Sequence, residues 1–351
     1  MRRGRWSLLT AAVLGLAMLA GACGDDEGGS ADDGDSGGSE EAELVIYSGR
    51  NEDLVQPLID TFSEEHGIKV EVRYGNSAEM GAQLLEEGTD TPADLFYSQE
   101  VGAIGVLAKA DLLAPLPTEL VDRVDERFRP HEGTDWVGVT GRSRVIVHNP
   151  DLVAEAPTSV LDLTDPKYKD QVAWVPSNAS FQSFITAFRV TQGDEAVREW
   201  LEAMKANGAK AYESNVDVLE AVNNGDIGLG LINHYYWARM ADEVGGADKM
   251  TAKLIFPEGD DPGALVNATA AAITVNGEDN PAALEFIEFL LSEEGQTEFV
   301  NETWEYPLVR DVADPAGLPA LEELGGPQLD LTDLDSLEQT QQLLTDVGLL
   351  G

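Results

Sequence analysis

Cysteine is almost absent from this chain, and positive charge is scarce. Cys23 is the single cysteine in 351 residues, which excludes an internal disulfide, a cysteine-based metal site and a cysteine nucleophile in the folded part. Lysine and arginine total 22 against 65 aspartates and glutamates, so the formal net charge is −43. A field of this sign repels nucleic acid and anionic lipid surfaces, and neither is expected as a partner.

The motifs of common enzymes are also lacking. No Gly-x-Ser-x-Gly motif stands between a strand-like and a helix-like segment, and there is no Walker loop and no His-Glu-x-x-His zinc motif. The four histidines are separated along the chain, and we expect them at the surface or as caps: His66, His131, His148 and His234. These absences favour a binding protein over an enzyme, with a secreted hydrolase as the weaker alternative.

The N-terminus has the pattern of an export signal. A basic start precedes an apolar run at residues 7–20 that is too short for a stop-transfer helix, so residues 1–22 are predicted to be a secretory signal peptide. Cys23 ends the sequence LAGAC, which resembles a bacterial lipidation site, although Ala20 stands where leucine is usual. We expect lipid on Cys23 to anchor the protein at the extracytoplasmic face of the membrane. The alternative is ordinary secretion with an unpaired cysteine.

An acidic tether is predicted to follow the lipidated residue. From residue 24 to residue 43 the chain holds no apolar side chain larger than alanine. Such a segment cannot bury enough surface to fold, and its negative charges repel one another. Residues 23–43 are therefore expected to be a lipidated cysteine followed by a disordered acidic linker.

Strand-like and helical periods alternate from residue 44 onward. The order β-α-β-α-β predicts a mostly parallel sheet with crossover helices. Ligands of such sheets bind at the carboxyl ends of the strands, which here are Ser48–Asn51, Tyr74–Ser77 and Ser98–Glu100. A second α/β unit begins near Val145, so the chain is predicted to fold into two lobes.

Seven sequence motifs occur in the order found in one known family. They are IYSGRNED, PADLFYSQE, GVTGRSRVIVHN, LTDPKYKDQVAWVPS, SNVDVLEAVNNGDIGLGLINHYYW, DDPGALVN, and LLSEEGQ followed by YPLVR. Over residues 44–310 the chain resembles the ferric-iron-binding periplasmic proteins of ABC transporters. The resemblance implies an α/β, two-lobed periplasmic-binding-protein fold of type II, and a monomeric, non-enzymatic lipoprotein that delivers ferric iron to an ABC permease.

The resemblance also implies how the chain is divided into lobes. The first lobe is expected to contain residues 44–143 and 267–310, and the second lobe residues 144–266 and 311–351. The crossings near residues 143 and 267 would form the hinge that lets the lobes close on their cargo.

Two adjacent tyrosines follow the apolar strand GLGLIN. In the family such a pair supplies phenolate ligands to ferric iron, which implies metal ligation by Tyr235 and Tyr236. A phenol with a pKa near ~10 is neutral unless a strongly charged cation stabilises the anion. Phenolate is a hard oxygen donor and suits a hard cation. The alternative is that the two rings pack at the start of a helix.

The resemblance implies a small anion that completes the charge balance of the metal, with carbonate, phosphate or citrate as candidates. Arg142 matches the arginine that anchors this anion, and Arg144 is the alternative because alternation puts both on one face of a strand. The remaining positions that match anion contacts are Ser177, Asn178, Ala179, Ser180 and Asn215. The Ser/Asn-rich turn at residues 177–180 could instead cap a helix.

The first lobe departs from the family pattern at two positions. Asn51 and Gln99 stand where many members have a histidine and a glutamate that bind the metal. Glu100 or Tyr47 is a candidate substitute, although Tyr47 can equally be a core residue. Alternatively, the tyrosines, the anion and water hold the metal, or the cargo is an iron chelate or a small anionic solute such as an organophosphonate.

Overall fold

The computed structural model describes residues 43–351. The predicted signal peptide, Cys23 and the predicted tether up to residue 42 lie outside the described residues, so these predictions stay untested. Within residues 43–351, no helix is both long enough and apolar enough to cross a membrane.

A parallel βαβ unit begins the described chain, as the alternating pattern predicted. β1 pairs in parallel with β2 on one side and with β3 on the other. Its elements are β1 (Glu43–Ser48), α1 (Glu52–His66), β2 (Lys69–Tyr74), α2 (Ser77–Glu87), β3 (Leu95–Ser98), α3 (Val101–Lys109) and the short α4 (Thr118–Val121).

Helix α1 illustrates how local sequence sets these elements. The Asn51 side chain caps its first turn by accepting from the Asp53 amide, and Gly67 ends it in the left-handed region at φ 67°. The buried face consists of Val55, Leu58, Ile59 and Phe62, the spacing expected of an amphipathic helix.

The long strand β4 (Val137–His148) joins two sheets. Its first part, up to Ser143, pairs antiparallel with β9, whereas the part from Arg144 onward pairs with β7 and β8. The elements of the second sheet are β5 (Val172–Trp174), α5 (Ala179–Gln192), α6 (Asp194–Ala206), β6 (Lys210–Ala211), α7 (Asn215–Asn224), β7 (Leu229–Asn233), α8 (His234–Glu243) and β8 (Lys253–Ile255).

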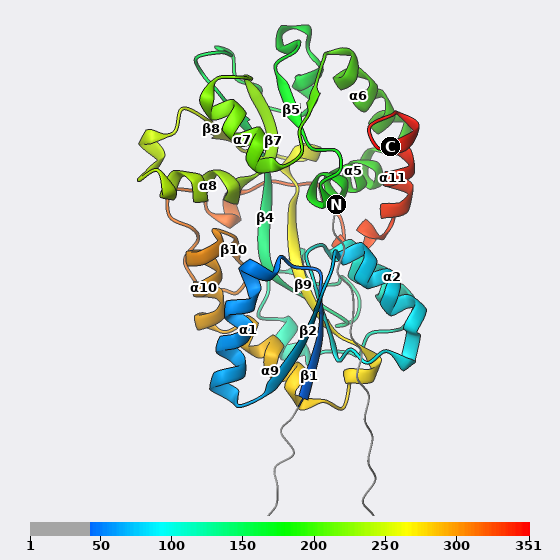
Figure 1. The fold of residues 1–351 in the computed structure, drawn as a ribbon. Coiled ribbons are helices and arrows are strands. Elements are labelled where there is room, and N and C mark those ends of the chain that lie inside the picture. The colour runs from blue at the N-terminus through cyan, green and yellow to red at the C-terminus, as the bar shows by residue number, and fades with distance from the viewer. Residues whose placement is uncertain (1–42) are drawn as a thin grey trace, which may run out of the picture. The chain divides into compact units, whose positions relative to one another are not determined.

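The chain then returns to the first sheet. β9 (Val266–Ile273) lies between β3 and β4, and the strand order is β2-β1-β3-β9-β4-β7-β5-β6. The elements that follow are α9 (Pro281–Leu290), α10 (Glu293–Thr303), β10 (Tyr306–Pro307) and α11 (Leu337–Asp346). β4 and β9 run side by side between the two groups of elements (Figure 1). The two-lobed type II architecture is therefore confirmed, and we propose that the lobes meet where β4 changes partner.

The C-terminal segment contacts both groups of elements. Thr332 and Leu334 lie so close to α3 that a Cβ on Gly105 would be 2.4 Å from the Thr332 carbonyl oxygen, and one on Gly102 would be 2.3 Å from that of Leu334. Farther along, Thr340 of α11 hydrogen-bonds the Thr186 hydroxyl of α5 at 2.7 Å. Residues 330–347 therefore form a strap that crosses from α3 to α5.

Candidate functional site

The tyrosine pair lies in the first turn of α8, and His234 separates it from Asn233 at the carboxyl end of β7. The ring centroids of Tyr235 and Tyr236 are 4.4 Å apart with an angle of 34° between the planes. Tyr235 is buried and Tyr236 is half-buried. Burial raises the pKa of Tyr235, as do the neighbouring Tyr236 and Glu305, while Arg142 acts in the opposite direction. Without a cation the buried phenol is therefore neutral.

His234 fixes the start of α8 immediately before the pair. Its Nδ1 accepts from the Ser143 amide at 3.1 Å, and its Nε2 lies 2.8 Å from the Trp304 carbonyl oxygen, to which it donates. Burial lowers the pKa of His234 to about 4, so the ring is neutral at ordinary pH. The expectation of a surface or capping residue is wrong for His234 and for His148, both of which are buried.

Arg142 carries a charge that is compensated within the chain. It is buried, and its Nη2 lies 3.1 Å from the Glu100 carboxylate. Its guanidinium also donates to the Ser180 hydroxyl at 3.1 Å and to the Gln99 carbonyl oxygen. Burial acts to lower the pKa of Arg142, but Glu100 and Glu305 hold it above its usual value.

Arg144 is equally buried but has only neutral hydrogen-bond partners within the described chain. It donates to the Asn233 side chain at 3.3 Å and to the Leu231 carbonyl at 3.1 Å, and its Nε has no partner there. Its guanidinium lies 5.5 Å from the Phe181 ring centroid. Burial lowers the pKa of Arg144 to about 10, against the opposing effect of the nearby phenols. Within residues 43–351 this buried charge forms no ion pair, although Glu100 is near enough to raise its pKa.

A small cavity of about 10 Å³ lies between the two guanidinium groups. Arg142, Arg144, Ser180, Phe184, Asn233, Leu265 and Asn267 line it. A volume of this size holds about one water molecule. Both arginines therefore line one small, partly open space, as expected for two residues on one face of a strand.

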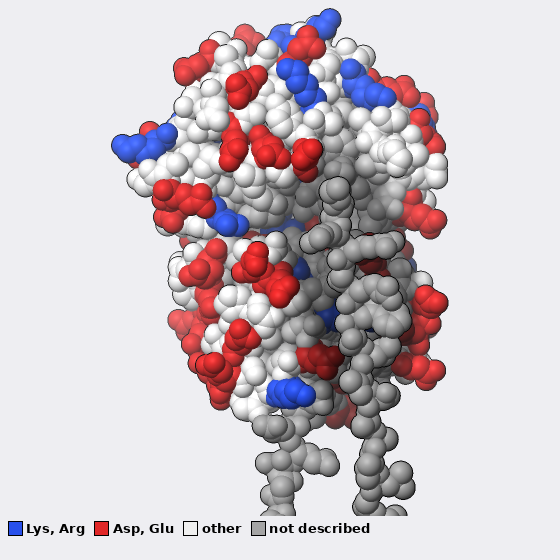
Figure 2. Space-filling model, viewed as in Figure 1, with Lys and Arg blue, Asp and Glu red and all other residues white. Residues whose placement is uncertain are grey.

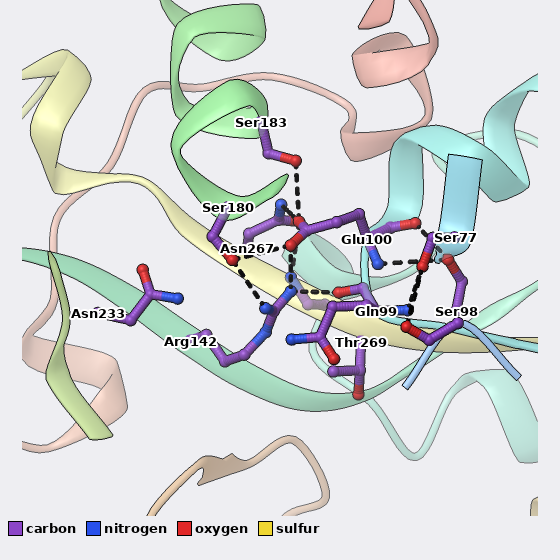
Figure 3. A network of polar contacts seen from close by, with 12 residues as sticks. Ser77, Ser98, Gln99, Glu100, Arg142, Ser180, Ser183, Asn233, Asn267 and Thr269 are labelled. Carbon is purple, nitrogen blue, oxygen red and sulfur yellow. Dashed lines mark hydrogen bonds and ion pairs between the residues drawn. The ribbon is translucent and has the colours of Figure 1, made fainter. Parts of the chain in front are cut away.

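Glu100 is the centre of the polar network around this cavity (Figure 3). Its carboxylate accepts from the hydroxyls of Ser180 and Ser183, each at 2.9 Å, and from the Asn267 amide. These donors come from α5 and β9, whereas Glu100 follows β3. Glu100, a candidate substitute metal ligand, therefore uses its carboxylate oxygens to accept hydrogen bonds from other residues of the protein.

Three other first-lobe candidates have their polar groups engaged elsewhere. Asn51 is exposed and caps α1. The Gln99 side-chain oxygen accepts from Arg50 at 2.7 Å. The Tyr47 hydroxyl lies 3.3 Å from Glu87, with its ring in the core. In this arrangement none of the three contacts the tyrosine pair through these groups.

The predicted anion-binding turn serves two roles. The Asn178 side chain caps α5 by accepting from the Phe181 amide at 3.2 Å, which is the alternative the sequence left open. Ser180 points to Arg142 and Glu100, whereas Ser177 and Ala179 are exposed. Asn215 is buried at the start of α7, and neither polar atom of its side chain has a partner in the described chain.

Sequence reasoning missed the buried pair Arg50–Glu305. Two hydrogen bonds of 3.0 and 3.1 Å join the guanidinium to the carboxylate, and the side chains are 0% and 1% exposed. Burial acts to raise the pKa of Glu305, but Arg50 and Arg142 hold it below its usual value. Arg50 belongs to the motif IYSGRNED, but nothing local indicates a partner 255 positions away.

The donor set limits which metals the site suits. Among the described residues, no group of three or more His, Cys, Asp or Glu side chains is placed to hold a metal ion. A metal at this site would depend on phenolate oxygen, which suits a hard, highly charged cation.

Two α/β lobes with polar side chains converging between them define a solute-binding protein. The chain belongs to the family of bacterial extracellular solute-binding proteins, whose model matches residues 90–324. The prediction of a binding protein rather than an enzyme is confirmed by this membership and by the relatives.

The relatives of this chain include named iron-binding proteins. The major ferric iron-binding protein of Neisseria meningitidis is 33% identical over 88% of this chain and 93% of its own length. The Fe(3+)-binding periplasmic protein of Serratia marcescens is 34% identical over 88% and 90%. The crystal structure of iron-bound HitA from Pseudomonas aeruginosa matches with a TM-score of 0.79 and 32% identity, over 88% of this chain and 99% of that one.

Proposed function

We propose that this protein binds ferric iron between its lobes and delivers it to an ABC permease. The observation that carries the proposal is the tyrosine pair, with its rings 4.4 Å apart in the first turn of α8. Two adjacent phenols offer two anionic oxygens to one cation, and a trivalent ion can displace their protons. The names of the relatives in Neisseria and Serratia support the choice of cargo.

An anion completes the charge balance in this proposal. Two phenolates leave one positive charge on a ferric ion, and carbonate, phosphate or citrate would neutralise it. Within the described chain Arg144 forms no ion pair and its Nε has no hydrogen-bond partner, and the side chain of Asn215 has no partner either. Because buried polar groups are normally satisfied, both residues fit an anion that arrives with the metal.

The second lobe provides most of the ligands in this proposal. Asn51, Gln99 and Tyr47 are engaged in capping, in an arginine contact and in the core, respectively. Loss of Asn51 should therefore cost little iron affinity, whereas loss of both phenols should abolish it.

The location of the protein is part of the proposal. Lipid on Cys23 would hold a monomer at the extracytoplasmic face, and residues 24–43 would give it reach toward the permease. Figure 2 shows aspartate and glutamate side chains spread over the visible face, with few basic ones between them. This distribution disfavours nucleic acid as a partner.

Two buried guanidinium groups also favour a second candidate cargo, an anionic one. An iron chelate or an organophosphonate-like anion would use Arg142 and Arg144 without needing phenolates. Such a ligand exceeds the cavity of about 10 Å³, so its entry requires the lobes to separate.

Titration of the purified protein with ferric citrate separates these candidates. Iron bound by tyrosinate gives a visible charge-transfer band, which should be absent from the double variant Tyr235→Phe/Tyr236→Phe. Tyr74→Phe removes a half-buried hydroxyl that contacts Gln56, and serves as the control that keeps the band. A rise in Tm without a band would favour the chelate or the anion. If neither the band nor the rise in Tm is observed, both cargo proposals are refuted.

A further inference from the structure

The carboxylate of Glu100 occupies a position built for an anion. It lies between the Arg142 guanidinium at 3.1 Å and the hydroxyls of Ser180 and Ser183, each at 2.9 Å, with the Asn267 amide as a fourth donor. The residue is 6% exposed. Arg142 and Asn267 face each other in the register of β4 and β9, so two paired strands aim their donors at one point.

The N-terminal part of α5 adds to this environment. Ser180 and Ser183 lie in the first five residues of a 14-residue helix. The partial positive charge at such a terminus favours a negative group, and a buried guanidinium strengthens the attraction. Glu100 is the N-cap residue of α3, yet its side chain makes no cap hydrogen bond to that helix. The carboxylate turns toward α5 and away from its own helix.

The donors of Glu100 overlap with the residues predicted for an external anion. The family resemblance implies that Arg142 and Ser180 contact the anion, and both line the cavity together with Arg144. An oxyanion bound at Arg142 would compete with the Glu100 carboxylate for the same hydrogen-bond donors, and the two negative charges would lie close together. Two negative groups this close repel each other strongly in a buried site.

We propose that Glu100 is a built-in competitor of the anion and sets how tightly this site takes an external oxyanion. When the lobes are together, the chain's own carboxylate occupies Arg142 and Ser180. A small oxyanion such as phosphate or carbonate gains these donors only when Glu100 is displaced. The inference rests on the proposed function for its biological setting, but its test needs no iron.

Phosphate binding by the iron-free protein tests the inference. Isothermal titration calorimetry with inorganic phosphate should give a Kd about tenfold lower or more for Glu100→Gln than for the unmodified protein, because the competing charge is gone and Arg142 is free. Glu87→Gln is the matched control, since Glu87, the last residue of α2, is another carboxylate that accepts from protein donors, here Tyr47, Gln83 and Thr91. It should leave the Kd unchanged.

Two further variants identify the site and guard against misfolding. Ser183→Ala removes a donor to Glu100 that does not line the cavity, so it should strengthen phosphate binding by a smaller factor. Arg142→Gln combined with Glu100→Gln should remove the gain.

The inference fails if Glu100→Gln binds phosphate no more tightly than the unmodified protein, or if the gain persists without Arg142. The proposed function is judged separately by the tyrosinate band, which this titration does not involve.

Discussion

Glu305→Gln changes one atom in the most deeply buried ion pair of the described chain. The Arg50–Glu305 contact is bidentate at 3.0 and 3.1 Å, with both side chains at most 1% exposed. The amide keeps one acceptor oxygen but loses the charge. Arg50 is then buried without a counterion, and such a group costs several kcal/mol.

The structure allows an estimate of the loss of stability. Removing one partner of a buried pair costs about 3 to 5 kcal/mol, and the remaining hydrogen bond puts this substitution near the lower end. For a chain of this size, a loss of about 3 kcal/mol lowers Tm by about 6 °C. Thermal unfolding followed by circular dichroism measures the change directly.

The matched control is Glu155→Gln, the same substitution in an exposed pair. Lys167 and Glu155 are 3.0 Å apart, with side chains 44% and 80% exposed. Exposed pairs contribute little to stability, so Tm should not change measurably. Equal effects of the two substitutions would refute the argument from burial, as would an unchanged Tm for Glu305→Gln.

Two other predictions concern pH and packing. Because the folded protein holds the pKa of His234 at about 4, below the usual 6.5, stability is fully present above pH 6.5 and is lost as the pH falls toward 4. The loss is up to about 3 kcal/mol, and urea midpoints measured against pH should show a flatter curve for His234→Gln; an identical curve would contradict the assignment. Gly105→Ala places a methyl group 2.4 Å from the Thr332 carbonyl oxygen, so it should release the strap and expose it to limited proteolysis. An unaltered cleavage pattern would show that the close contact is not required.

Local patterns predicted much of the fold and one part of the site. The alternation of strand-like and helical spacing from residue 44 predicted the parallel pairing of β1, β2 and β3. It could do so because the spacing of apolar residues differs between a strand and a helix and is visible within each segment. The tyrosine pair was singled out because it follows an apolar strand, with only His234 between them, and because it matches the tyrosines of the family that the chain resembles. The helix cap at Asn178, which the sequence offered as the alternative to anion binding, is present, because a cap needs only one side chain and one amide three residues away.

The long-range contacts of the polar network around Glu100 and of the Arg50–Glu305 pair could not be predicted from local sequence patterns. Glu100 reaches donors 80, 83 and 167 positions along the chain, and Arg50 reaches Glu305 across 255. Asn267 meets Glu100 because β9 returns between β3 and β4, whereas Ser180 and Ser183 come from α5 and Glu305 directly precedes β10. Glu100 was one of two candidate substitutes for a metal ligand, because its donors could not be assigned from the sequence before the positions of α5 and β9 were known.

The place of β9 in the sheet also affects how a newly made chain acquires its structure. β3 and β4 each pair with β9, so their facing edges stay open until residues 266–273 have been synthesised. Sheets that depend on such distant segments form slowly, and their open edges invite association with other chains. A nascent chain that lacks residues 266–273 therefore cannot complete its sheet, and both strand edges are available for non-native pairing until β9 has been made.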